Sequence, residues 1–271
     1  MKKFLVIGLA LAFFISVIGG AQQPTENGTF AYQITKKSTG TTEKAGEESF
    51  VLQKQADGTF RLVSSFKALS EELKAEYGTD DLFSLDMTTD ANSRLVNYKI
   101  TSKTIKGQFD VLVAVTNGQV AKIVLKTKDP AGKETSSERE VILGKDGDPD
   151  QVQPLIATGF AGSDLLVLQK FITANVKENK KSFLALDPFR LTSPVVKLDI
   201  ERLAPVKIKT DKDTIDVQRV GVTFKDEKGE TFSLELLSKD NVLQGITAEE
   251  PTSKLLIYRS DLYPKGFEVV K

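Results

Sequence analysis

The chain has 271 residues and 37 Lys and Arg against 37 Asp and Glu, so no strong net field is present to attract nucleic acid or an anionic membrane surface. It contains neither Cys nor His, which excludes disulfides, thiol and imidazole catalysis and the usual zinc sites. We interpret carboxylates as the only credible catalytic groups that remain.

The first residues predict export. Lys2 and Lys3 precede the apolar run FLVIGLALAFFISVI, and small residues up to Ala21 precede a polar stretch. This order is typical of a secretory signal peptide over residues 1–21. The run is short for a membrane crossing, which needs about 20 apolar residues, and an uncleaved N-terminal anchor is the alternative. We expect a soluble protein of residues 22–271, periplasmic or extracellular.

Alternation of apolar and polar residues with a period of two predicts strands along most of the exported chain. In TFAYQIT, for example, Phe30, Tyr32 and Ile34 share one face. Asp57-Gly58 favours a hairpin turn between two such runs. Further runs of this kind are RLVNYKI, VVKLDI, TFSLELLS and KLLIYRS. Short connections between them predict antiparallel pairing.

The segment DVLVAVTNGQVAKIVLKTK contains the clearest hairpin signal, because Asn117-Gly118 tolerates the positive φ angles of a two-residue turn. Pairing of Thr116 with Gln119 would make both faces of this hairpin largely apolar. Both faces would then need cover. Either a second sheet packs over the hairpin, or the sheet curls so that its concave side encloses an apolar cavity.

One segment has helical spacing instead. SDLLVLQKFITANVKENKK, from Ser163 to Lys181, carries an apolar stripe, and Ser163 is a suitable N-cap. A weaker helix is predicted from Leu69 to Gly78. The predicted fold is therefore mainly β: a strongly curved, half-barrel-like antiparallel sheet with one or two covering helices. We expect a single β-rich domain over residues 22–271, with a helical insert near 163–181.

No acidic cluster makes a convincing site. Asp146, Asp148 and Asp150 alternate as at the start of a calcium loop, but Gln151 stands where that loop requires Gly. We interpret them, and the aspartates within 211–216, as turns. No motif pairs two carboxylates as a glycosidase requires. We therefore expect no catalytic residue, no metal and no cofactor; a carboxylate-based hydrolase is the enzymatic alternative.

The order of these elements resembles a known group of proteins. GTFAYQIT, DANSRLVNYKI, PLIATGFAGSDLLVLQKFI and SLELLSKDNVLQGITAE follow one another as in the uncharacterised bacterial periplasmic β-rich proteins near the lipoprotein-carrier (LolA/LolB-like) fold. The resemblance covers nearly all of residues 22–271. It implies a half-barrel plugged by helices, which binds a lipid, an acyl chain or another apolar ligand and transfers it across the periplasm. The carriers use several helices, whereas this sequence has one strong helix.

Our leading hypothesis is an exported, non-enzymatic protein that encloses an apolar ligand or a lipid-modified partner between the curved sheet and the helix. Gly159 and Gly162 would let the helix move as a lid. The predicted ligand-binding residues on its inner surface are Phe160, Leu165, Leu168, Phe171 and Ile172. The alternative is a cell-envelope scaffold with a packed interior, which contacts an envelope protein through exposed strand edges.

Overall fold

The computed structural model describes residues 26–144, 151–158, 161–190, 192–225 and 231–270; the predicted signal peptide lies outside them. The helices are α1 Glu71–Tyr77 and α2 Gly162–Asn175. The strands are β1 Glu26–Lys36, β2 Thr42–Lys54, β3 Phe60–Ala68, β4 Asp81–Thr89, β5 Leu95–Thr104, β6 Gly107–Thr116, β7 Val120–Lys128, β8 Glu134–Ile142, β9 Val152–Ile156, β10 Lys180–Leu186, β11 Val195–Thr210, β12 Thr214–Lys225, β13 Thr231–Lys239, β14 Val242–Glu249, β15 Ser253–Arg259 and β16 Phe267–Val270. Within the described ranges, neither helix has the length and apolar character of a membrane span.

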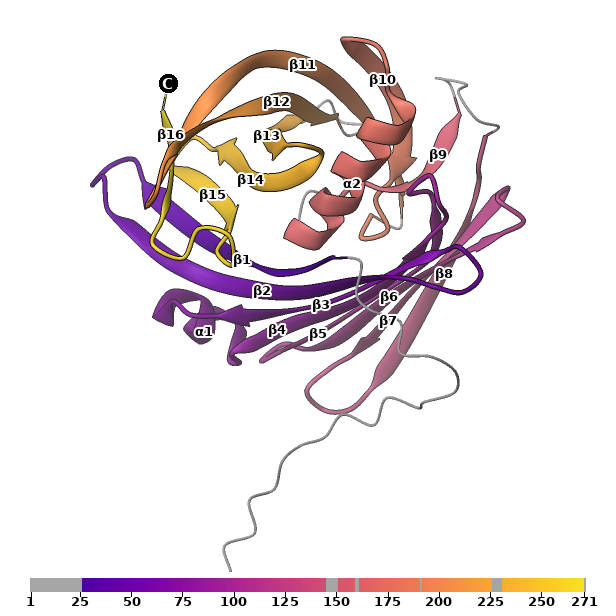
Figure 1. The fold of residues 1–271 in the computed structure, drawn as a ribbon. Helices are drawn as coiled ribbons and strands as arrows, with labels where there is room; N and C mark the ends of the chain where they lie inside the picture. The colour runs from indigo at the N-terminus through magenta and orange to yellow at the C-terminus, as the bar shows by residue number, and fades with distance from the viewer. Residues whose placement is uncertain (1–25, 145–150, 159–160, 191, 226–230, 271) are drawn as a thin grey trace, which may run out of the picture.

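All sixteen strands belong to one sheet. Its order is β8-β7-β6-β5-β4-β3-β2-β1-β15-β14-β13-β12-β11-β10-β9, and β16 pairs with β11 outside this path. Neighbouring strands are antiparallel except β9 and β10, which are parallel. The sheet bends until it is nearly closed, with β8 and β9 at the two ends of the order (Figure 1). The predicted mainly β, strongly curved sheet is confirmed.

The β6–β7 turn differs from the prediction by one residue. Asn117 and Gly118 do adopt positive φ angles, of 51° and 66°. The Gln119 N–H donates to the Thr116 carbonyl at 3.0 Å, which closes the turn. However, the strand register pairs Thr116 with Val120, so Gln119 is an extra residue in the connection.

This shift changes which side chains share a face of the hairpin. Val111, Val113, Ala121 and Ile123 all lie on one buried face, whereas Ala114 on the other face is exposed. The expectation that both faces need cover was therefore wrong at this hairpin. One apolar face packs against the core, and the other remains in contact with solvent, as is common for antiparallel sheets.

The helix α2 lies inside the curve of the sheet (Figure 1). It is buried on nearly all sides, and its apolar residues belong to the same hydrophobic core as those of the surrounding strands. The predicted helix extended too far, because α2 ends at Asn175 and Lys180 begins β10. In β10, Phe183 and Ala185 alternate as buried residues and pair with β11, so the period of two prevails over the helical pattern.

The short helix α1 confirms the weaker of the two helix predictions. The Ser70 hydroxyl accepts a hydrogen bond from the Leu73 N–H at 3.3 Å, which caps the helix. Gly78 ends it with a φ of 69°, a conformation that favours glycine. No residue of α1 is buried, and the helix lies outside the sheet (Figure 1). Its contribution to the core is the half-buried side chain of Leu73, which packs against the hydrophobic cluster of the strands.

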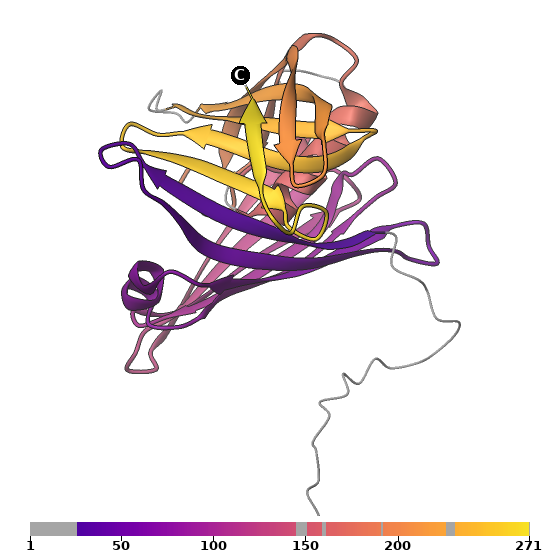
Figure 2. The same ribbon diagram turned by 60° about the vertical axis from the view of Figure 1, so that its left-hand side comes forward.

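A second layer covers part of the outer face of the sheet. The pairing of β11 with β12 is irregular between Leu203 and Val206, where Pro205 lacks a backbone donor. Beyond this point the two strands fold across the sheet, and β16 pairs with β11 there (Figure 2). We call residues 206–217 together with 267–270 the arm.

The arm is held by a small hydrophobic cluster of its own. Three arm residues and three outward-facing residues of the sheet form it: Ile208, Val217, Phe267, Ala31, Leu237 and Tyr258. Gly245 lies directly beneath the Phe267 ring, because a Cβ atom at this position would be 2.9 Å from Phe267 Cζ. The tip of the arm is a turn at Asp211 and Asp213, as predicted, but Asp216 lies within β12.

Candidate binding groove

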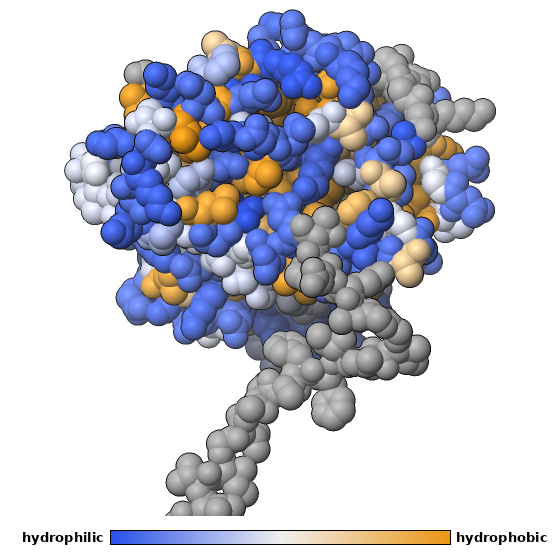
Figure 3. Space-filling view, viewed as in Figure 1, coloured by the Kyte–Doolittle hydropathy of each residue, from blue (hydrophilic) through white to orange (hydrophobic). Residues whose placement is uncertain are grey.

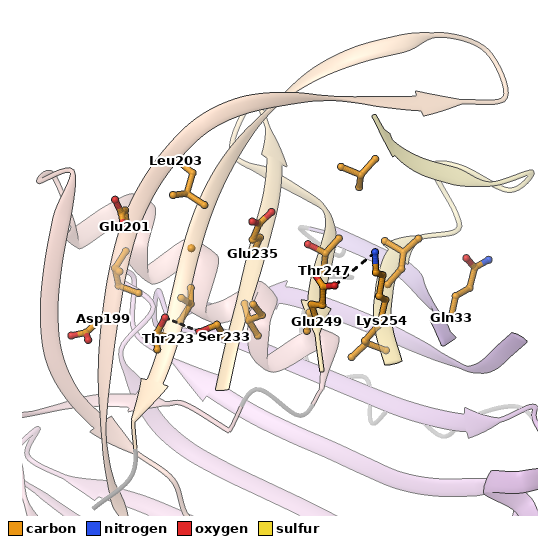
Figure 4. Close-up of a pocket in the computed structure, with 18 of the residues that line it drawn as sticks. Gln33, Asp199, Glu201, Leu203, Thr223, Ser233, Glu235, Thr247, Glu249 and Lys254 are labelled. Atoms are coloured by element: carbon orange, nitrogen blue, oxygen red, sulfur yellow. Dashed lines mark hydrogen bonds and ion pairs between the residues drawn. The ribbon is translucent and has the colours of Figure 1, made fainter. Parts of the chain in front are cut away.

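The outer face of the sheet beside the arm is hollowed into a groove of about 1100 Å³ (Figure 4). Its floor crosses six strands, because the strand register aligns one outward-facing residue from each strand. From β1 to β11 this row is Gln33, Leu256, Thr247, Glu235, Gly221 and Glu201. The groove is therefore a direct result of the pairing register.

Apolar side chains border the groove near the arm. Phe267 and Val269 contribute from β16, and Leu203 contributes from the base of the arm. Leu256 on the floor also packs against the hydrophobic cluster of the arm. Gly221 has no side chain to fill the middle, and a Cβ atom there would lie 3.3 Å from Leu203 Cδ1. A larger residue at this position would obstruct the groove.

Hydroxyl groups line the part of the groove farther from the arm. Along β13, Leu237 lies under the arm, Glu235 lies on the floor, and Ser233 lies a further two residues away. The Ser233 hydroxyl is 2.9 Å from the Thr223 hydroxyl on β12 (Figure 4). Thr35 also lines the groove, so the side next to the arm is apolar, whereas the far side carries hydroxyl groups together with paired charged residues such as Asp199 and Lys254.

Each lysine that lines the groove, and Glu235 on its floor, has an oppositely charged partner. Lys180 contacts Glu201 at 2.7 Å, and Lys254 contacts Glu249 at 3.8 Å. Arg219 binds the carboxylate of Glu235 through two hydrogen bonds, of 3.1 and 2.7 Å. The face of the molecule seen in Figure 3 is mostly hydrophilic, with scattered hydrophobic groups.

Asp199 shows the effect of this pairing on a carboxyl group. Burial raises its pKa, but the hydrogen bonds from Lys225 and Ser182 outweigh that effect and lower the pKa below its usual value. The carboxylate also lies 3.5 Å from Lys197 Nζ. This group is therefore held in its charged form and is a poor candidate for a general acid.

A second polar cluster lies inside the sheet, at the beginning of α2. Glu48 on β2 is completely buried and accepts hydrogen bonds from the Tyr32 hydroxyl, the Gly162 N–H at 2.8 Å and the Ser163 hydroxyl. Ala161 occupies the N-cap position and offers no side-chain bond, so Glu48 caps the helix from a neighbouring strand. The predicted N-cap role of Ser163 was wrong, since Ser163 lies within the helix.

Asp164 is the other buried carboxyl group of this cluster. It accepts a hydrogen bond from the Thr158 hydroxyl at 2.8 Å and a longer one, of 3.5 Å, from the Tyr98 hydroxyl. Its Oδ1 atom has no hydrogen-bond partner among the described residues. Burial is the main cause that raises the pKa of Asp164 to about 7. These contacts anchor α2, and no group of three or more acidic side chains within the described ranges is arranged to hold a metal ion.

The residues predicted to bind the ligand lie in the core rather than in the groove. Leu165, Leu168, Phe171 and Ile172 are between 1% and 4% exposed and pack in the same cluster as the sheet. Phe160 and the hinge residue Gly159 lie outside the described residues, as do Asp146, Asp148 and Asp150. The ligand-binding role of the helix stays a prediction.

The groove is not apparent from the sequence. Its floor residues lie on the polar faces of strands, which an alternating pattern assigns to solvent. The available signal was VVKLDIERLAPVKIKT, which reads as two short strands but forms one strand of 16 residues. A strand of this length exceeds the usual roughly 3–10 residues, and Pro205 within it marks the point where the pairing with β12 becomes irregular.

No family model and no curated protein matches the sequence. Among solved structures, the chain is similar to a beta-barrel-like protein of a domain of unknown function, DUF1849, from Brucella abortus. The two chains are 10% identical, the similarity covers 90% of this chain and 97% of the other, and the TM-score is 0.46. The resemblance to the lipoprotein-carrier fold stays a prediction.

Proposed function

We propose that the protein is an exported, non-enzymatic binding protein for a partly apolar ligand, and that this ligand occupies the groove beside the arm. The observation that carries the proposal is the groove itself. Its volume of about 1100 Å³ lies just above the range of roughly 300–1,000 Å³ typical of ligand sites. Its combination of apolar and polar residues is also typical of such sites.

The space between the sheet and α2 supports the proposal less well. A ligand there would have to displace buried side chains such as those of Leu168 and Ile172. Exposing each of these side chains to water costs about 1.5–3 kcal/mol of free energy. Displacing the helix would also break the hydrogen bonds between Glu48 and the helix N-terminus. The groove requires no comparable rearrangement. Apolar contact would supply affinity at roughly 25 cal/mol per Å² removed from water.

Binding of N-phenylnaphthylamine, an uncharged dye that fluoresces in apolar surroundings, tests the proposal. Gly221→Phe places a ring in the groove, whereas Ala114→Phe adds the same ring to an exposed position of β6. We expect the first variant to bind the dye at least about tenfold more weakly, equal to roughly 1.4 kcal/mol, and the second to match the parent. Equal affinity of a folded Gly221→Phe variant would place the site elsewhere.

A scaffold role is the second candidate, and β8 is the observation that favours it. Eight of its nine residues are exposed, and within the described residues it is an end strand of the sheet with one neighbour, β7. Such an edge can accept a strand from another protein. Native mass spectrometry of protein purified from cells separates the two roles: a bound small molecule favours the groove, and an added polypeptide chain favours β8.

A further inference from the structure

We infer that the groove selects amphiphiles that carry no net charge, with an apolar tail and a head rich in hydroxyl groups. The neutral glycolipids and alkyl glycosides have this chemistry. The inference rests on the proposed function, because it specifies the ligand class of the same groove. It follows from two features of the lining: the pairing of its charges and the separation of its apolar and hydroxyl-bearing sides.

Each lysine that lines the groove has an acidic partner. Besides the pairs of Lys180 and Lys254, Lys181 contacts Glu178 at 3.1 Å, and Lys197 contacts Asp199 at 3.5 Å. The lining contains five carboxylates and four lysines, so its field does not attract anions. A phosphate or carboxylate head would have to take a lysine from an existing ion pair. Exposed pairs of this kind are each worth up to about 1 kcal/mol, which corresponds to roughly fivefold in affinity.

The lining also separates an apolar side from a hydroxyl-bearing side. Leu256 and Phe267 lie next to the arm, where an acyl or alkyl chain would exclude water. Thr223 and Ser233 lie on the far side, and each hydroxyl keeps bonding capacity beyond their mutual hydrogen bond. Thr247 lies between the two sides on the floor. A molecule with a tail at one end and a sugar-like head at the other matches this order.

Competition with N-phenylnaphthylamine tests the selectivity. Three competitors share a decyl tail and differ in their heads: decyl maltoside is neutral, decyl phosphate is anionic, and decyltrimethylammonium is cationic. Each is used below the concentration at which it forms micelles. We expect decyl maltoside to displace the dye at a concentration at least about fivefold lower than either charged compound.

Variants then test the two features separately. Replacing both Thr223 with Val and Ser233 with Ala should weaken displacement by decyl maltoside severalfold, when the displacing concentration is compared with the dye affinity of the same variant. The matched control is Thr127→Val with Thr135→Ala, which removes a similar pair of hydroxyl groups, 2.6 Å apart, from β7 and β8. Glu201→Gln should free its lysine and improve displacement by decyl phosphate.

The outcomes separate the two proposals. If the dye does not bind, or if Gly221→Phe binds it as well as the parent, the proposed function is wrong and the inference fails with it. If the dye binds in the groove but decyl phosphate or decyltrimethylammonium displaces it as well as decyl maltoside, only the selectivity for neutral ligands is wrong. Loss of decyl maltoside affinity in the β7–β8 control would also overturn the assignment of its head to Thr223 and Ser233.

Discussion

Replacing Asp164 with Asn should change how the stability of the protein depends on pH. In the folded protein the pKa of Asp164 is about 7, compared with its usual value of 3.8. Burial is the main cause, the hydrogen bond from Thr158 opposes it, and the nearby charge of Glu48 reinforces it. Asn has nearly the same shape and still accepts a hydrogen bond from Thr158, but it carries no charge.

The raised pKa determines the sign of the effect. The folded state binds the proton of Asp164 more tightly than the unfolded state does, so this group favours folding at low pH. That contribution is complete below about pH 3.8 and is lost as the pH rises to about 7. With 1.36 kcal/mol for each pKa unit, the total loss is about 4 kcal/mol. Between pH 5 and pH 8 the same relation gives a loss of about 2.5 kcal/mol.

Urea denaturation at pH 5 and pH 8 measures this loss. Between these two values, the free energy of unfolding of the parent should fall by about 2.5 kcal/mol relative to that of Asp164→Asn. Asp216→Asn, at an exposed position of β12, is the control and should follow the parent. If the parent and Asp164→Asn change in parallel, the buried carboxyl group is already ionised at pH 5, and the reasoning from its burial is wrong.

Three further substitutions test the anchor of α2, the arm and the interior. Glu48→Ala should lower the free energy of unfolding by at least about 2 kcal/mol in urea titrations, because it leaves buried donors, including the Tyr32 hydroxyl, without their acceptor; a loss below 0.5 kcal/mol would contradict the capping role. Gly245→Val should displace the Phe267 ring, loosen the arm and raise its protease sensitivity. Unchanged cleavage would show that the ring moves without cost. Leu168→Ala should cost about 2–5 kcal/mol of stability but leave the dye affinity of the folded protein unchanged. Weaker binding would favour the site between sheet and helix.

The sequence was sufficient for the fold class because local patterns and the global fold agree there. The alternating pattern predicts that Phe30 and Tyr32 point inward, and both are buried in β1. Ser70 and Gly78 cap the two ends of α1, which are the positions that Ser and Gly favour. The helix was recognised from its apolar spacing. Its end was misjudged because Lys180 suits a helix C-terminus and a strand start equally well, and only pairing with β11 decides between them.

The groove could not be predicted because it depends on contacts between distant segments. Whether an outward-facing residue such as Thr247 meets solvent or an arm depends on where β11 and β12 leave the sheet. Sequence alternation gives the face of a residue but not what lies above that face. The same limit applies to Glu48, whose fully buried carboxylate lies in a strand that reads as polar and caps a helix more than 100 residues away.

Two glycines on the outer face show how the arm both forms the groove and limits it. Gly245 and Gly221 lie on the same side of the sheet, and each leaves a gap where a strand residue normally places a side chain. The gap at Gly245 is filled by the Phe267 ring, so the arm is fixed at that position. The gap at Gly221 lies one row beyond the arm and stays open in the middle of the groove floor. If the arm packed one row further along the strands, Phe267 would occupy the groove itself, so the position of one aromatic ring determines whether this face can accept a ligand.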